Sequence, residues 1–221
     1  MEKNTKVLFL SFLIFIISIS TVLISYFISL KYNFIEACIP NIDGCFSISR
    51  VGRNPPAIYL FKTGLSIVAL LIFYFFWLLR TKNKYSEVFY VFSILACFFL
   101  LLYIFFLGES TAYRFFRKIG IFFYIFLIIF SQFFLYLSFK GLIDNYLFRY
   151  GYWLSILIIA IGVACIPLMY AVSGEFSQLK NAISWNYFLL IKINFLLFGI
   201  SYYKSIKCCL LYTSPSPRTS L

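Results

Sequence analysis

The chain has 221 residues, of which 63% are apolar and 12% are charged, and its mean hydropathy is +0.95. Soluble domains are closer to half apolar and a quarter charged, and a soluble fold of this size could not remove so much apolar surface from water. The composition therefore argues against a water-soluble enzyme, a disordered chain or a small disulfide scaffold, and indicates a protein that uses lipid as its solvent. Histidine is absent, which excludes haem or zinc ligation through His and a Ser-His-Asp triad.

The chain carries 19 Lys and Arg residues against 7 Asp and Glu, which gives a formal net charge of +12. In a soluble protein such an excess would suggest a nucleic-acid partner. Here the basic residues fall in the short gaps between apolar stretches, where Lys and Arg set the orientation of membrane helices. We therefore expect a lipid bilayer, and no nucleic acid, as the partner of most of the chain.

Six apolar stretches are long enough to cross a bilayer core, which needs roughly 20 residues in a helix. In chain order they cover residues 7–30, 57–79, 88–107, 119–139, 151–174 and 181–203. They are predicted to be helices because lipid offers no hydrogen-bond partner for an unpaired backbone group, and because none shows the sustained alternation of a barrel strand. The predicted fold class is all-α, a polytopic membrane bundle of six transmembrane helices that forms one domain over residues 1–207.

The first stretch follows a basic start at Lys3 and Lys6, as the core of a secretory signal does. Its apolar run is longer than the roughly 7–15 residues of a signal core, and no small-x-small cleavage site follows it closely. We therefore interpret it as a retained first helix.

The gap between the first two stretches, residues 31–56, is the longest in the chain and contains Cys38 and Cys45 with six residues between them. On the oxidising side of a membrane such a pair can form a disulfide, which would stabilise this short loop by roughly 2–3 kcal/mol. The alternative is two unpaired thiols. The spacing is not that of a C-x-x-C redox pair, so a thiol oxidoreductase is not expected.

A specific motif leads into the second stretch. Residues 48–61 read Ile-Ser-Arg-Val-Gly-Arg-Asn-Pro-Pro-Ala-Ile-Tyr-Leu-Phe, in which Gly52, Pro56 and Phe61 follow Ser49 by three, seven and twelve residues. Physically, Gly52 permits a tight turn, Pro56 suits the start of a helix, and Phe61 can anchor that helix near the interface. The alternative is an ordinary Gly/Pro loop that enters a helix.

The motif resembles the first-loop signature of the family that groups the damage-regulated autophagy modulators with the FGF-receptor-activating protein. The resemblance implies six helices, cytoplasmic ends and a motif in the first non-cytoplasmic loop. Arg50 and Ala57 stand where the family usually has Asp and Glu.

The last stretch contains the only charge well inside a predicted span. Lys192 lies 11 residues beyond the start of the stretch, which is about 16 Å along a helix and near the middle of a core roughly 30 Å thick. An ionisable group there is costly unless it finds water or a partner. Trp185, seven residues earlier on the same face, can line a polar cavity with it. Alternatively, Lys192 extends to a headgroup. The polar residues that can pair with it are Gln132, Glu175 and Asn194.

Both chain ends are predicted to lie in the cytoplasm, because six spans return the chain to its starting side and Lys and Arg accumulate on the cytoplasmic side. The side with the ends carries ten basic residues: Lys3, Lys6, Arg80, Lys82, Lys84, Lys140, Arg149, Lys204, Lys207 and Arg218. The other side carries seven: Lys31, Arg50, Arg53, Arg114, Arg117, Lys118 and Lys180. Residues 31–56 are therefore expected outside.

Residues 208–221 form a tail of different composition, with adjacent cysteines followed by Ser and Pro. We expect it to be either a disordered Ser/Pro-rich tail or translated adapter sequence that does not belong to the fold.

The resemblance implies a non-enzymatic regulatory or lipid-associated protein, because members of that family are linked to autophagy control and to lipid or glycolipid-anchor handling. One alternative is a lipid or glycolipid-anchor remodelling factor that acts through the Ser49–Phe61 loop and Lys192. Another is a small transporter component with Lys192 in its pathway. No cofactor and no metal are expected. The expected partners are lipid headgroups or another membrane protein, and the expected location is a plasma, inner or internal membrane.

Overall fold

The computed structural model describes residues 3–108, 111–143, 145–171 and 177–212. Its helices in chain order are α1 (Lys3–Lys31), α2 (Pro40–Asp43), α3 (Ile48–Val51), α4 (Ala57–Leu79), α5 (Lys84–Phe105), α6 (Thr111–Phe139), α7 (Tyr146–Ala171) and α8 (Ser177–Tyr212). These residues contain no named strand, and six of the helices, α1 and α4 to α8, are long and apolar enough to cross a membrane. The predicted six-helix, all-α membrane fold is confirmed.

The bounds of the helices differ from the predicted spans except in α4, which covers 57–79 as expected. Helix α6 begins eight residues before the predicted span, and α8 begins at Ser177 and continues to Tyr212. The predicted spans end at the first charged residue, because a charge lowers the local hydropathy. In the structure, backbone hydrogen bonds continue the helices past these charges. Helix α5 also begins early, because the Asn83 side-chain oxygen accepts a hydrogen bond from the backbone N–H of Tyr85 (3.4 Å) and caps its first turn.

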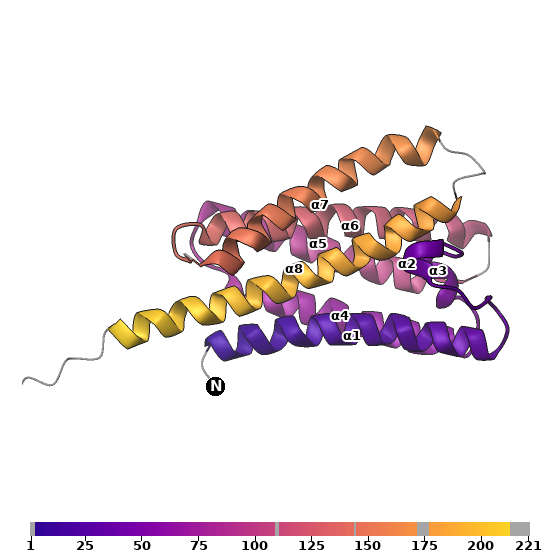
Figure 1. Ribbon diagram of the computed structural model, residues 1–221, viewed down its shortest axis with the longest axis horizontal. Helices are drawn as coiled ribbons and strands as arrows, with labels where there is room; N and C mark the ends of the chain where they lie inside the picture. Colours follow the sequence, from indigo (N-terminus) through magenta and orange to yellow (C-terminus); the bar gives the residue numbers. More distant parts are fainter. Residues whose placement is uncertain (1–2, 109–110, 144, 172–176, 213–221) are drawn as a thin grey trace, which may run out of the picture.

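The six long helices form a closed ring in which α1 contacts α4 and α8, and each helix from α4 to α7 contacts the next helix along the chain. Successive helices run in opposite directions, so α1 starts and α8 ends at the same end of the bundle (Figure 1). We call this the terminal end. Helices α2 and α3 lie over the opposite end, which we call the loop end.

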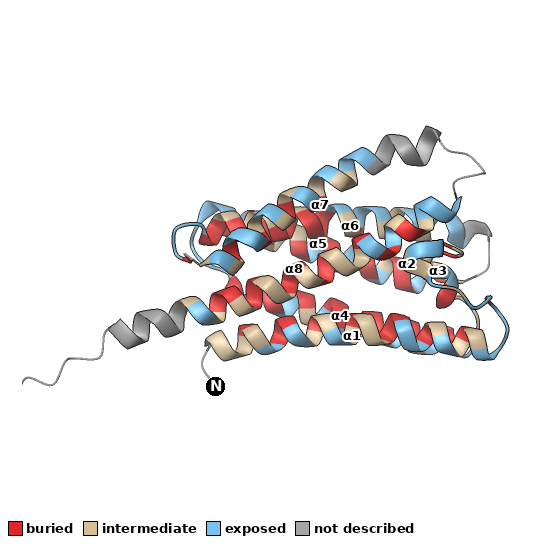
Figure 2. Ribbon diagram, in the orientation of Figure 1, coloured by how far each residue is buried: buried red, intermediate tan, exposed pale blue. Residues whose placement is uncertain are grey.

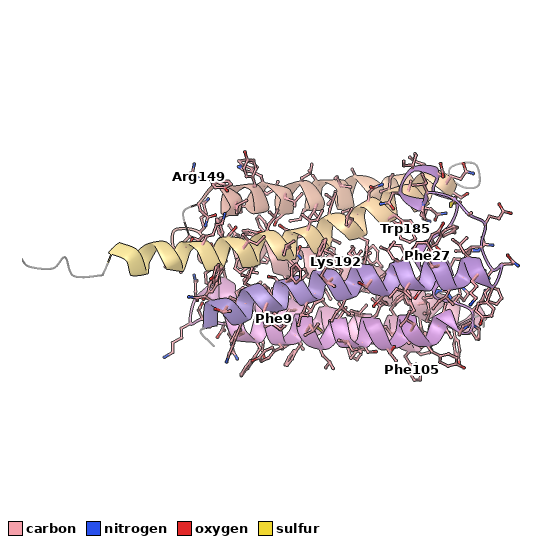
Figure 3. The ribbon with its side chains drawn as sticks, turned by 60° about the horizontal axis from the view of Figure 1, so that its bottom comes forward. Phe9, Phe27, Phe105, Arg149, Trp185 and Lys192 are labelled. Atoms are coloured by element: carbon pink, nitrogen blue, oxygen red, sulfur yellow. A yellow bond between two sulfur atoms is a disulfide. The ribbon has the colours of Figure 1, made fainter. Side chains whose placement is uncertain are left out.

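Aromatic side chains fill the centre of the ring. Phe75 of α4 meets Phe195 of α8 edge to face, with ring centroids 5.5 Å apart, and Phe76 meets Phe89 of α5 at 5.7 Å. Figure 2 shows buried residues along the inner faces of the helices and exposed ones outside. The exposed positions are also apolar, as Phe9, Phe27 and Phe105 illustrate in Figure 3. A bundle that is apolar inside and outside is suited to lipid rather than water.

Glycines let neighbouring helices approach closely. A side chain at Gly120 of α6 would come within 2.8 Å of the backbone nitrogen of Tyr103 in α5. In lipid there is no hydrophobic force that drives helices together, so their association depends on close packing. Small residues support this packing because they let two backbones approach each other. The same crowding occurs where Gly64 meets Thr21, Gly151 meets Tyr136, Gly162 meets Tyr187 and Gly199 meets Ser11.

Helix α7 is the least enclosed member of the ring. It packs on α6 and α8 near the terminal end and then diverges from both toward the loop end (Figure 1). The hydroxyl of Tyr187 in α8 donates a hydrogen bond to the carbonyl of Ile158 in α7 (2.9 Å). Beyond this contact, the two helices separate on the lipid-facing side of the bundle.

Candidate functional site

Residues 32–56, which we call the outer cap, form a compact structure over the loop end. Cys38 and Cys45 are joined by a disulfide that encloses α2. Within this ring, the Asp43 carboxylate accepts a hydrogen bond from the Ile39 backbone N–H (2.8 Å). Gly44 ends α2 with φ = +60°, a conformation that favours glycine. The two cysteines therefore do not remain as unpaired thiols.

Three side chains of α8 bind the outer cap by donating to its backbone carbonyls. Asn181 donates to Gly44 (2.9 Å), and the indole N–H of Trp185 donates to Phe46 (3.0 Å). One turn beyond the first contact, the amide of Asn186 donates to the carbonyl of Asn41 (2.8 Å). Each bond satisfies a carbonyl that would otherwise face the bundle, and together they hold the cap against one transmembrane helix.

Helix α1 holds the other side of the cap. The Tyr26 hydroxyl donates to the carbonyl of Cys38 (2.8 Å), and the buried Ser29 hydroxyl donates to that of Val51 (2.6 Å). Because both contacts lie toward the C-terminal end of α1, they close the cap over the interior of the bundle.

The four residues of the family-like motif occupy the junction of the cap with α4. A side chain at Gly52 would collide with the ring of Phe61, because this ring packs directly against the Gly52 backbone. Phe61 is only 1% exposed, which corrects the expectation that it anchors at the interface: its ring covers the turn instead. Pro56 directly precedes α4, and the hydroxyl of Ser49 lies 3.2 Å from that of Ser47.

Lys192 lies inside the bundle and is 1% exposed. Its ammonium donates a hydrogen bond to the Tyr124 hydroxyl (3.2 Å) and lies 5.4 Å from the ring centre of Phe188 and 6.0 Å from that of Phe195. Aromatic faces attract a cation, so these rings partly replace water. The alternative of a side chain that extends to a headgroup is wrong, because Lys192 is enclosed in the interior. Figure 3 shows Lys192 on α8, further from the cap than Trp185.

A second polar cluster lies beside Lys192 and links α6, α7 and α8. Asn194 donates to the side-chain oxygen of Gln132 (3.0 Å) and to the hydroxyl of Ser155 (2.9 Å). The Gln132 amide in turn donates to the carbonyl of Ile191 (3.1 Å). Gln132 and Asn194 therefore bind each other rather than Lys192, and the third expected partner, Glu175, lies outside the described residues. Trp185 and Lys192 do not line a shared cavity, because the Trp185 indole is hydrogen-bonded to Phe46 in the cap.

A groove of about 400 Å³ follows the outward face of α8 where α7 diverges from it. We call it the α7–α8 groove. Its α8 wall is made by residues three or four apart, which share one helix face. The lining residues are Asn41, Ile42, Ile161, Leu179, Ala182, Ile183, Asn186, Tyr187 and Leu190.

Sequence reasoning missed this groove. Its apolar residues look like any other part of a membrane span, and its amide wall combines Asn41 with Asn186, which are 145 positions apart. The only local signal was the periodic spacing along α8. Within the described residues, no group of three or more His, Cys, Asp or Glu side chains is placed to hold a metal ion.

Comparison with known proteins found no matching family model, no matching curated protein and no matching solved structure. The resemblance to the autophagy-modulator family therefore stays a hypothesis that depends on the motif. Six apolar helices, arranged in one ring, identify the chain as a multi-pass integral membrane protein.

Proposed function

We propose that this protein is a non-enzymatic, lipid-associated regulatory membrane protein of the kind that the motif resembles, and that it binds a bilayer lipid in the α7–α8 groove. The observation that carries the proposal is the groove itself. It is apolar, lies on the lipid-facing side of the bundle and has the side-chain amides of Asn41 and Asn186 in its wall.

The dimensions of the groove suit one lipid chain. Its wall on α8 runs from Leu179 to Leu190, which is about 16 Å along a helix. That is about half the thickness of a bilayer core and thus the depth of one leaflet. Ile42 stands on the rim with 74% of its surface exposed, and this apolar side chain is suited to contact with lipid.

The amide wall supplies the polar part of recognition. Asn41 and Asn186 form a weak amide–amide contact (3.5 Å), and Asn41 uses only one of its two N–H donors in it. The second donor can bind an ester carbonyl of a glycerolipid. Because the described residues of the lining include no ionised side chain, we expect this binding to depend little on salt.

The chemistry of the lining favours binding over conversion. General acid–base catalysis needs a positioned proton donor and acceptor. Among the described residues of the groove lining, the titratable group is the Tyr187 hydroxyl, which is hydrogen-bonded to Ile158. The remodelling alternative would require Ser49 and Lys192 to act together. Ser49 lies in the outer cap, whereas Lys192 is enclosed among aromatic rings inside the bundle.

Photocrosslinking tests the proposal. The purified chain is placed in nanodiscs that contain a phosphatidylcholine with a photoreactive group on its acyl chain, and crosslinked peptides are mapped by mass spectrometry. We expect crosslinks to concentrate on residues 179–190 and 161. I161W fills the groove and should remove most of them, whereas L157W, at an exposed site on the same helix, should not.

The lipid recovered from the same sample distinguishes the alternatives. Recovery of unchanged phosphatidylcholine supports association without chemistry. A lyso-lipid or an acyl-exchanged product would favour the remodelling factor, and equal crosslinking of I161W and the parent chain would overturn the groove as the site.

A further inference from the structure

The walls of the α7–α8 groove come from two kinds of element. Most of the lining residues belong to the long helices α7 and α8, whereas Asn41 and Ile42 belong to the short helix α2 of the outer cap. Helix α2 packs against α8 at the loop end (Figure 1). The shape of the groove therefore depends on one short element that is not part of the helical ring.

Helix α2 has few interactions of its own that fix its position. None of its four residues is buried, so it gains little from hydrophobic packing, and so short a segment has no helical stability of its own in water. The bond from the Ile39 N–H to Asp43 and the bond from Asn186 to the Asn41 carbonyl are both exposed. Exposed hydrogen bonds contribute little, because water offers similar partners.

The disulfide between Cys38 and Cys45 is the covalent constraint on α2. It joins residues seven positions apart and encloses the whole helix, and a cross-link of this kind removes open conformations of the loop. The enclosed ring touches α8 through backbone atoms, since a side chain at Gly44 would collide with the carbonyl oxygen of Gln178. So close a contact needs a fixed ring shape, and the disulfide therefore holds α2 in the groove wall.

A reductant at the loop end can reach this disulfide. Both cysteines are partly exposed, and the adjoining residues Ala37 and Ile39 are exposed. The thiolate of a dithiol attacks the S–S bond, forms a mixed disulfide and leaves as a disulfide itself. The two electrons and two protons that the dithiol gives up appear as the thiols of Cys38 and Cys45. An oxidant of the disulfide class reverses the reaction.

We propose that the Cys38–Cys45 disulfide is a redox switch for lipid binding. The oxidised ring completes the α7–α8 groove, whereas reduction by a dithiol releases α2 and removes Asn41 and Ile42 from the wall. The change stays local, because α7 and α8 pack against each other and against the rest of the ring independently of α2. This inference rests on the proposed function of the groove and adds its regulation.

Photocrosslinking in the same phosphatidylcholine nanodiscs tests the switch. The parent chain is compared before and after treatment with dithiothreitol, and the thiols of Cys38 and Cys45 are counted by alkylation and mass spectrometry. We expect crosslinks on residues 179–190 to fall about fivefold, since a disulfide in a loop of this length shifts a local closing equilibrium by roughly tenfold or more. They should return when oxidised glutathione restores the disulfide.

Three variants separate the switch from other effects of the reductant. C38S/C45S should show weak crosslinking that does not respond to dithiothreitol. G44A keeps both cysteines but cannot fit against α8, so its crosslinking should be weak even when it is oxidised. C97A is the matched control, because it removes a buried thiol outside the ring; it should keep both the crosslinks and their response. Unchanged hydrogen exchange in α4 and α5 shows that each variant is folded.

Equal crosslinking of the oxidised and reduced parent chains would overturn the switch, and so would crosslinking of C38S/C45S at the level of the parent chain. A response of C38S/C45S to dithiothreitol, or a disulfide that an excess of dithiothreitol does not reduce, would overturn it too. In all these cases the oxidised parent chain still crosslinks in the groove, and the proposed function stands. If the oxidised chain gives no groove crosslinks, the proposed function itself fails.

Discussion

Lys192 is the side chain whose environment departs most from its ordinary preference for water. Its ammonium is satisfied by one hydroxyl and by aromatic faces rather than by a carboxylate. Replacing a buried charge by an apolar residue of similar shape is often neutral or stabilising, whereas removing its partner is costly.

We therefore expect K192M to unfold at the same temperature as the parent chain or higher. Y124F should lower the free energy of unfolding by about 1–3 kcal/mol, because it leaves the ammonium without its hydrogen bond. Thermal unfolding in one detergent, followed by tryptophan fluorescence, measures both variants. A large loss of stability in K192M would contradict this account. Loss of lipid crosslinking in K192M with an unchanged fold would favour the remodelling or transport alternatives.

Single residues were predictable where their chemistry conflicts with lipid. A lysine in the middle of an apolar run is conspicuous in any sequence, and so is a pair of cysteines in a loop. Their surroundings were not predictable, because the partner of Lys192 is 68 positions away and is one of 18 tyrosines. The buried Nε of Arg53, which has no partner among the described residues, likewise becomes visible only in the folded cap.

Among the elements, the outer cap is the one that is closed by a covalent cross-link, the disulfide between Cys38 and Cys45. The disulfide closes a short ring around α2, so its removal should cost about 2–3 kcal/mol on the chain-entropy model. We expect the double variant C38S/C45S to exchange backbone amide hydrogens faster across residues 38–46, while α4 and α5 keep their protection. Hydrogen exchange with mass spectrometry measures this. W185F keeps an aromatic ring at this position but removes the indole N–H that donates to Phe46, and it should loosen the same segment. Unchanged exchange in both variants would contradict the role of the cap contacts.

The long helices were predicted well because an uninterrupted apolar run is a local property. Helix ends were predicted less well, since they depend on caps and on backbone hydrogen bonds that continue past charges such as Arg117. The short helices α2 and α3 were not predicted. Their stability comes from the disulfide and from contacts with α1 and α8, and four or so residues have no helical tendency of their own in water.

At the scale of the whole molecule, the single span α4 lies between Arg50 and Lys82, so we expect these two residues on opposite sides of the membrane. Both are exposed, which makes them suited to chemical labelling. In a chain with Cys208 and Cys209 replaced by Ser, we expect R50C to react with an impermeant maleimide on intact cells and K82C to react only after permeabilisation. The reverse pattern would invert the proposed orientation with cytoplasmic ends, and labelling of both sites on intact cells would contradict the six-span arrangement.

Helix α8 is fastened at both membrane surfaces. Near one surface it holds the outer cap through Asn181 and Trp185, and near the other its Ser201 carbonyl accepts a hydrogen bond from Asn145 (3.0 Å). A helix of 36 residues is about 54 Å long, and its continuous backbone hydrogen bonds make its two ends move together. A tilt imposed on the helix at the cap is therefore transmitted through continuous backbone hydrogen bonds to the segment that holds Asn145, at the opposite end of the bundle.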